Sequence, residues 1–241
     1  MPLPREWTDA EELHVLTLPG AEPIRRPGVV GWESRDSPGG VLLDGLHVVS
    51  PAGVWAQLSV AGATGTDAET GKRWALDGEW LVAVGDYLLT GPRGPAGRSP
   101  LCTMVDLAAA ARRHRGKRGA KALTWALERV RTGPQSPRES LLRLALVHRG
   151  LPEPVVQMPV STAAGILHSD LGYPQQRVAI EYQGDHHRTD QKQWREDLRR
   201  RQLFEDAGCR VIEVGANEFD DDCASLALRV RRALAGRSYR P

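Results

Sequence analysis

The second half of the sequence carries its clearest helical patterns. Apolar residues recur at three- and four-residue spacing over residues 136–150 and 224–235, and a longer amphipathic stretch runs from residue 189 or 190 to 207. Ser136 is typical of a helix start, and Gly150 is typical of a helix end. We therefore predict three helices in this half of the chain.

Strand patterns lie between these helices. Residues 178–183 alternate between apolar and small or polar side chains, which is the periodicity of a strand. A partner strand begins near residue 166, and Pro174 ends it because proline lacks the N–H that a strand uses. Residues 155–160 and 210–214 are short apolar runs typical of strands. The predicted order is helix, three strands, helix, strand, helix.

The first half has weaker patterns. Short apolar runs predict strands at residues 13–18 and 41–49, and a buried strand or turn pair at 79–89. Amphipathic spacing predicts helices over residues 54–60, 103–114 and 120–131.

A length of 241 residues favours two domains. Glycine and proline interrupt the helical pattern at residues 132–136, and we place the boundary there. The predicted domains are residues 1–133 and 134–241. The mixture of helices and strands indicates the α/β (α+β) class, with a smaller mixed α+β domain first.

Composition narrows the class of protein. Apolar residues make up 41% of the chain, and no apolar run approaches the roughly 18 residues that span a bilayer. No signal-peptide pattern precedes the first predicted element. Cys102, Cys209 and Cys223 lack C-x-x-C spacing, so we expect the protein to reside in the reducing cytoplasm, without disulfides. A net charge of only +2 means that contact with nucleic acid would come from local patches.

One such patch lies between the two helices predicted at 103–114 and 120–131. Six basic residues occur there with no acidic neighbour: Arg112, Arg113, Arg115, Lys117, Arg118 and Lys121. Clustered Arg and Lys bind DNA phosphates by releasing counterions, so this stretch is a candidate DNA-binding surface. The alternative interpretation is a solvated turn between two helices.

Acidic residues converge in the predicted hairpin. Residues of like parity on paired strands share a face, so Asp170 is expected opposite the pair Glu181 and Gln183. Two carboxylates that meet in this way require a cation, a shared proton or an arginine nearby. The hairpin is therefore a candidate site.

Two further groups have both a structural and a functional interpretation. Glu139 is three residues past the predicted cap Ser136, where it would complete a capping box or point a third carboxylate toward the site. Asp197 lies on the stripe of Phe204 and beside Arg200, where it would form a simple ion pair or support the site.

Together these residues resemble a known family. The order of Glu139, Asp170, Glu181-Tyr-Gln-Gly-Asp-His186-His187 and Asp197-x-x-Arg200 resembles the very-short-patch-repair-like branch of the PD-(D/E)XK nuclease superfamily. More narrowly, residues 136–219 resemble its endonuclease-like domain of unknown function. Residues 40–131 bear a diffuse similarity to the C-terminal domain of abortive-infection type IV antitoxins, and carry no catalytic residues of that kind.

The resemblance implies a restriction-endonuclease-like αβββαβα core and Mg²⁺-dependent hydrolysis of DNA, with Mn²⁺ able to substitute. Asp170 and Glu181 would ligate the ion, the backbone carbonyl of Tyr182 would add a ligand, and Glu139 would complete the shell through water. Arg200 would steady the phosphate.

This sequence departs from the superfamily at one position, where Gln183 replaces lysine. Glutamine can orient a water or a phosphate but cannot take a proton. His186 or His187 could act as base or acid instead. A zinc site formed by these two residues and His168 is an alternative, although the spacing matches no standard ligand pattern.

Two other functions remain open from the sequence. The protein would be a catalytically silent DNA-binding or antitoxin-like regulator if Gln183 abolishes turnover. A separate possibility is a metal-dependent hydrolase of small phosphate esters, which the lack of any small-ligand motif disfavours.

Overall fold

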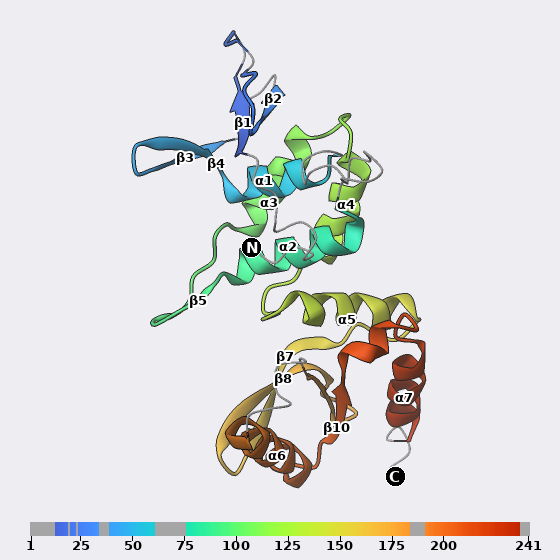
Figure 1. The fold of residues 1–241 in the computed structure, drawn as a ribbon. Coiled ribbons are helices and arrows are strands. Elements are labelled where there is room, and N and C mark those ends of the chain that lie inside the picture. The colour runs from blue at the N-terminus through green and yellow to red at the C-terminus, as the bar shows by residue number, and fades with distance from the viewer. Residues whose placement is uncertain are drawn as a thin grey trace. The chain divides into compact units, whose positions relative to one another are not determined.

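A computed structural model describes residues 13–18, 20–22, 24–33, 39–60, 76–183 and 191–236. The chain divides into two compact units, Met1–Thr132 and Gly133–Pro241, both drawn in Figure 1. The predicted boundary after residue 133 lies one residue beyond this division. The fold is mixed α/β, as the patterns indicate. In the part of the chain described, no helix has the length and apolar character needed to cross a membrane.

The N-terminal unit, predicted to be the smaller, spans more residues than the other. Over its described residues it contains helices α1 (Pro51–Leu58), α2 (Gly78–Thr90), α3 (Met104–Arg113) and α4 (Ala120–Arg129). Its strands form the parallel pair β1 (Leu13–Thr17) and β2 (Val29–Glu33), and the antiparallel pairs β3 (Gly40–Leu43) with β4 (Leu46–Val49) and β5 (Arg93–Gly94) with β6 (Gly97–Arg98). Trp55 is fully buried among the helices, and its indole N–H donates to the carbonyl of Leu81 at 2.8 Å.

Two predictions for this unit are wrong. Residues 41–49 form a hairpin rather than one strand, because Asp44 (φ 49°) and Gly45 (φ 81°) adopt the left-handed backbone of a tight two-residue turn. Residues 79–89 belong to helix α2, which starts where Asp77 accepts from the N–H of Trp80 at 2.8 Å. Most of α2 is buried, so its sequence lacks the polar face that distinguishes a helix from a buried strand.

The C-terminal unit is built around a four-stranded sheet in the order β10-β9-β8-β7. Along the chain its elements are α5 (Pro137–His148), β7 (Val155–Thr162), β8 (Gly165–Tyr173), β9 (Val178–Tyr182), α6 (Gln191–Asp206), β10 (Arg210–Val214), the 3-10 helix η3 (Ala216–Phe219) and α7 (Ala224–Ala235). Strand β10 runs parallel to β9, and the other neighbours are antiparallel.

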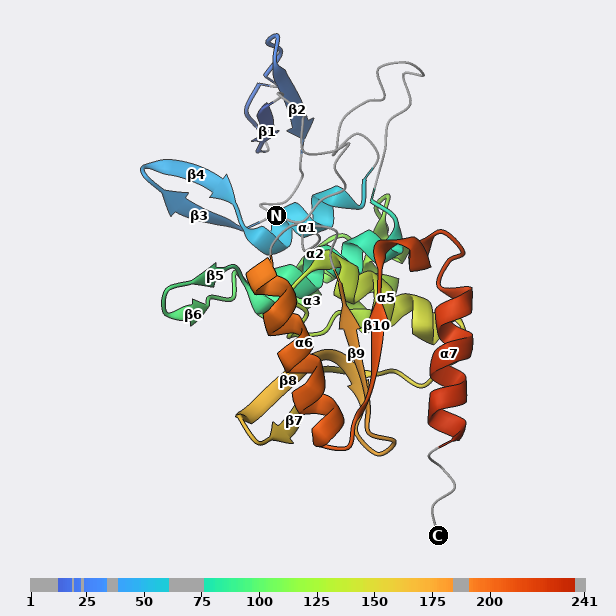
Figure 2. The ribbon, with the colours of Figure 1, turned by 60° about the horizontal axis from the view of Figure 1, so that its bottom comes forward.

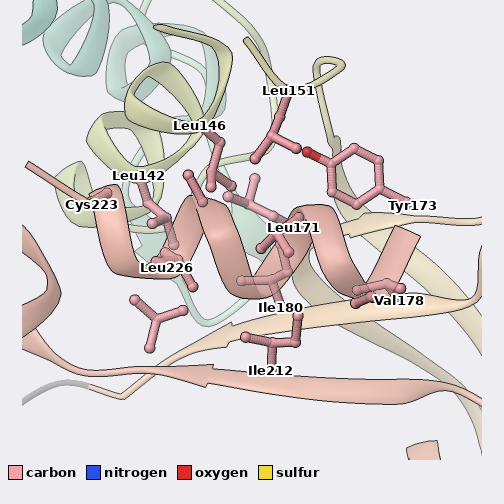
Figure 3. Close-up of a cluster of buried hydrophobic side chains, with 14 residues drawn as sticks. Leu142, Leu146, Leu151, Leu171, Tyr173, Val178, Ile180, Ile212, Cys223 and Leu226 are labelled. Carbon is pink, nitrogen blue, oxygen red and sulfur yellow. The ribbon is translucent and has the colours of Figure 1, made fainter. Parts of the chain in front are cut away.

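The two faces of this sheet carry separate apolar clusters. Ile180 joins Leu142 of α5 and Leu226 of α7 in the larger cluster, which is drawn in Figure 3. The next residue back, Ala179, packs with Phe204 of α6 in the smaller one. Figure 2 shows α6 and α7 on different sides of β9 and β10. The alternation predicted for residues 178–183 therefore serves two buried faces.

Candidate functional site

Strands β8 and β9 are paired at one end and part at the other. Their backbone ladder stops where Leu171 faces Ile180. Beyond it, the N–H of Asp170 donates to Glu181 Oε1 at 3.2 Å, and the N–H of Tyr182 donates to Asp170 Oδ2 at 2.8 Å. Here side-chain carboxylates, instead of backbone carbonyls, accept the hydrogen bonds between the strands. These two bonds keep the carboxylates of Asp170 and Glu181 close to each other.

Arg200 reaches the same spot from helix α6. Its Nε donates to Glu181 Oε2 at 2.8 Å and its Nη2 to Glu181 Oε1 at 3.4 Å. Nη2 also donates to the carbonyl of His168, and the guanidinium lies 5.1 Å from the centre of the Phe204 ring. Burial opposes the charge of Arg200, but its hydrogen bond with Glu181 and the surrounding acids raise its pKa. Arg200 is therefore the cationic partner of this acidic pair.

Glu139 approaches from the first turn of α5, and its side chain is buried. The predicted capping box forms in part: the hydroxyl of Ser136 accepts from the N–H of Glu139 at 3.3 Å. The carboxylate, however, accepts from the N–H of Gln135 at 2.8 Å, one residue before the cap. The amide of Gln157 donates to the same oxygen at 3.4 Å, which draws the carboxylate away from the cap.

Burial and neighbouring acids together set the electrostatics of the site. Burial, followed by the charges of Glu139 and Glu181, raises the pKa of Asp170 from 3.8 to about 7. The hydrogen bond from the N–H of Tyr182 and the charge of Arg200 lower it by less. One arginine therefore does not neutralise the three carboxylates, and near neutral pH Asp170 is only partly ionised.

The remaining predicted site residues are Asp197, Gln183 and three histidines. Asp197 is among the charges that raise the pKa of Arg200. The backbone N–H of Gln183 donates to a carbonyl of β10 at 2.8 Å, which extends the pairing of β9. His186 and His187 lie outside the described residues, so their roles in proton transfer and in a zinc site stay predictions. The third zinc candidate, His168, has an exposed side chain.

The acidic pair fits a hard divalent cation. Mg²⁺ keeps several waters and takes one or two carboxylates, so Asp170 and Glu181 are sufficient protein ligands. Burial and the charges of Glu139 and Glu181 raise the pKa of Asp170, and a nearby cation would favour its ionised form. Among the residues described, no group of three or more His, Cys, Asp or Glu has metal-site spacing. Arg200 holds both oxygens of Glu181, so an ion would compete with it.

The basic patch of the N-terminal unit is an anchored turn between α3 and α4. Each of its six cationic side chains is exposed: Arg112, Arg113, Arg115, Lys117, Arg118 and Lys121. Gly116 and Gly119 have φ values of 76° and 81°, which only glycine adopts without strain. A Cβ on Gly119 would lie 2.2 Å from Ser59 Oγ, so the turn packs closely on the end of α1. The patch therefore presents its charges from a fixed backbone.

Sequence reasoning missed Gln135 and Gln157. Their side chains are joined by a hydrogen bond of 2.7 Å from Gln135 Nε2 to Gln157 Oε1, and both residues contact the carboxylate of Glu139. The one available signal was a polar residue inside the apolar run at 155–160. A hydrogen bond between residues 22 positions apart leaves no periodic pattern in a sequence.

Comparison with known proteins gives distant relatives without an assigned activity. The chain is 26% identical over 138 residues to the uncharacterized protein Rv2248 of Mycobacterium tuberculosis strain H37Rv, and equally to the uncharacterized protein MT2308 of strain CDC 1551 / Oshkosh. The alignment covers 57% of this chain, and the chain spans about half the length of these relatives, 51%. No protein-family profile matches the chain. No solved structure matches it either.

Proposed function

We propose that the C-terminal unit is a metal-dependent DNA endonuclease domain, as the resemblance of residues 136–219 implies. The observation that carries the proposal is the meeting of Asp170, Glu181 and Arg200 where β8 and β9 part. Hydrolysis of a phosphodiester needs oxygen ligands for a divalent cation and a positive group beside the phosphate, and these residue types supply both. The order α5, β7, β8, β9, α6, β10, α7 supports a restriction-endonuclease-like αβββαβα core.

In this proposal Asp170 and Glu181 hold Mg²⁺, or Mn²⁺ in its place. The backbone carbonyl of Tyr182 would be a further ligand, and Glu139 would complete the shell through water. The ion, when bound, supplies a water that is nucleophilic at neutral pH and offsets negative charge on the phosphate.

The remaining steps belong to the protein's own side chains. Once released from the oxygens of Glu181, Arg200 would offer a planar set of N–H donors that suits two phosphate oxygens. Gln183 can orient a water or the phosphate, but it cannot accept a proton. Proton transfer is therefore assigned to His186 or His187, since imidazole titrates near neutral pH.

DNA binding is assigned in part to the turn between α3 and α4. Its exposed arginines and lysines would bind phosphates without reading sequence, so they would add affinity for any duplex. Replacing Arg115, Lys117 and Arg118 by glutamine should weaken binding to all duplexes alike. The slope of log affinity against log salt concentration should become shallower by about one for each phosphate that is no longer neutralised. A solvated turn without a DNA role would leave both quantities unchanged.

Cleavage of plasmid DNA tests the enzyme proposal directly. Wild-type protein is incubated with supercoiled, linear and single-stranded DNA in Mg²⁺ or Mn²⁺, beside Asp170→Asn and Glu181→Gln. The matched control is Asp206→Asn, which alters an exposed carboxylate at the end of α6. We expect cleavage by wild type and the control, and a loss of at least about a hundredfold in the two site variants. Equal cleavage by all four proteins would exclude this site.

A second candidate is a catalytically silent DNA-binding or antitoxin-like regulator. Two observations favour it: Gln183 stands in place of a lysine, and Arg200 already occupies both oxygens of Glu181. Calorimetry with Mn²⁺ separates the candidates. The endonuclease binds the ion in a manner that Asp170→Asn abolishes, whereas the regulator binds DNA equally well with EDTA and cleaves none.

A further inference from the structure

Gln157 lies on β7 opposite Asp170 of the neighbouring strand β8, and its backbone is unusual. The ladder between β7 and β8 pairs Val156 with Leu171 and resumes at Met158, so it skips the step that Gln157 and Asp170 occupy. Gln157 has a φ of 48° in the middle of a strand. A left-handed backbone is disfavoured for a residue with a Cβ, because the Cβ crowds the following carbonyl oxygen.

At Gln157 the side chains of β7 change the face of the sheet on which they lie. Val156 packs against the cluster that contains α5 and α7, whereas Met158 belongs to the cluster that contains Phe204 of α6. Residues two positions apart in a regular strand share a face, so the left-handed residue between them has reversed the alternation. The backbone geometry thus has a packing role, which Gly or Asn would fulfil with less strain. The choice of glutamine requires a reason in its side chain.

The side chain of Gln157 links three elements of the site. Its Oε1 accepts from Gln135 Nε2 at 2.7 Å, and its Nε2 donates to Glu139 Oε2 at 3.4 Å. The same oxygen of Glu139 accepts from the backbone N–H of Gln135 at 2.8 Å. These contacts meet at one carboxylate oxygen of the buried Glu139, beside the step where Gln157 lies opposite Asp170.

We propose that Gln157 is a positioning residue that holds the carboxylate of Glu139 toward the metal site formed by Asp170 and Glu181. This inference rests on the proposed function. Strained backbone is retained where surrounding contacts enforce it, and it occurs preferentially at functional sites. Groups that orient a metal ligand, or a water bound to the metal, strengthen metal binding without touching the ion.

Two substitutions separate the backbone from the amide. Gln157→Gly keeps the left-handed backbone without strain and removes the amide. Gln157→Met keeps the length and the strain and also removes the amide. The matched control is Gln202→Met, which removes an exposed glutamine amide that donates to Asp206 at 2.8 Å, within helix α6. Each protein is measured for its melting temperature in EDTA and for its Mn²⁺ dissociation constant by calorimetry.

We expect Gln157→Gly to melt at a higher temperature than wild type and to bind Mn²⁺ about tenfold more weakly. Gln157→Met should lose the same affinity without the gain in melting temperature, and Gln202→Met should match wild type in affinity. A role in packing alone would leave the Mn²⁺ affinity of Gln157→Gly equal to that of wild type, and that result overturns the inference. If wild type itself binds no Mn²⁺, or if Asp170→Asn binds it equally well, the proposed metal site is wrong. The inference about Gln157, which depends on that site, is then wrong as well.

Discussion

The apolar cluster of the C-terminal unit and its acidic site are built from adjacent residues of the same two strands. Leu171 and Ile180 are fully buried at the last rung of the ladder, and Asp170 and Glu181 are the next residues on each strand. The apolar pair stabilises the fold by removing surface from water. At the acidic site, in contrast, burial and the charges of Glu139 and Glu181 raise the pKa of Asp170. The arrangement of the acids therefore lowers stability at pH values where the unfolded chain would ionise Asp170.

The largest effect should come from breaking the apolar region. Leu226 and Leu228 lie on α7, and the first is fully buried whereas 51% of the second is exposed. Leu226→Ala should lower the free energy of unfolding by about 3 kcal/mol, because it removes buried surface and leaves a cavity. Leu228→Ala should change it by less than about 0.5 kcal/mol. Urea denaturation of the two variants measures the difference, and equal losses would contradict the burial of this cluster.

In the acidic region, a substitution is expected to raise the free energy of unfolding instead of lowering it. Asp170 has a pKa of about 7 in the folded protein against an ordinary 3.8, so the folded state binds its proton more tightly than the unfolded chain does. Such a group has no cost below about pH 4; its cost grows as the pH rises from about 4 to about 7, and it levels off above the folded pKa. At 1.36 kcal/mol for each pKa unit, the upper limit of this cost is about 4 kcal/mol.

Asp170→Asn should therefore stabilise the protein by about 2 kcal/mol at pH 8 and by almost nothing at pH 4. Thermal or urea unfolding across this pH range measures the effect, with Asp206→Asn as the exposed control, for which we expect less than about 0.5 kcal/mol. A loss of stability at pH 8 would mean that Asp170 is held by favourable contacts instead of repulsion.

The smallest effect distinguishes two neighbouring arginines of α6. Arg200 pairs with Glu181, whose side chain is 12% exposed, whereas Arg201 pairs with Glu205 and Glu213, which are 41% and 42% exposed. Arg200→Met leaves a largely buried carboxylate without its cationic partner and should cost about 1.5 kcal/mol at pH 7. Arg201→Met should cost about 0.5 kcal/mol or less, because solvent screens its pairs.

Salt sharpens this comparison further. Raising the salt concentration should reduce the small cost of Arg201→Met and leave that of Arg200→Met nearly unchanged, since screening acts mainly on exposed charges. Two equal costs with the same salt dependence would place Arg200 among ordinary surface residues and weaken its assignment to the site.

Periodic patterns were sufficient for most elements of the C-terminal unit. Ser136 and Gly150 bracket α5, and the alternation around Ile180 identified β9, because one-dimensional spacing reflects which side of an element meets the core. The same method failed for α2, where Leu81 to Leu89 are mostly buried and offer no polar contrast. It also failed for the hairpin at Asp44 and Gly45, where a two-residue turn chemistry was overlooked.

The approach of Asp170 to Glu181 was predictable, since parity and turn length fix which residues of a hairpin share a face. Tertiary structure alone decided the rest of the site. The hydrogen bond from Arg200 to Glu181 joins residues 19 positions apart. The change of face at Gln157 depends on two apolar clusters that lie on opposite sides of β7. The spacing of apolar and polar residues reflects local structure and the side of an element that is buried. Contacts between segments distant in the sequence form only when the chain packs, so no local pattern reveals their geometry.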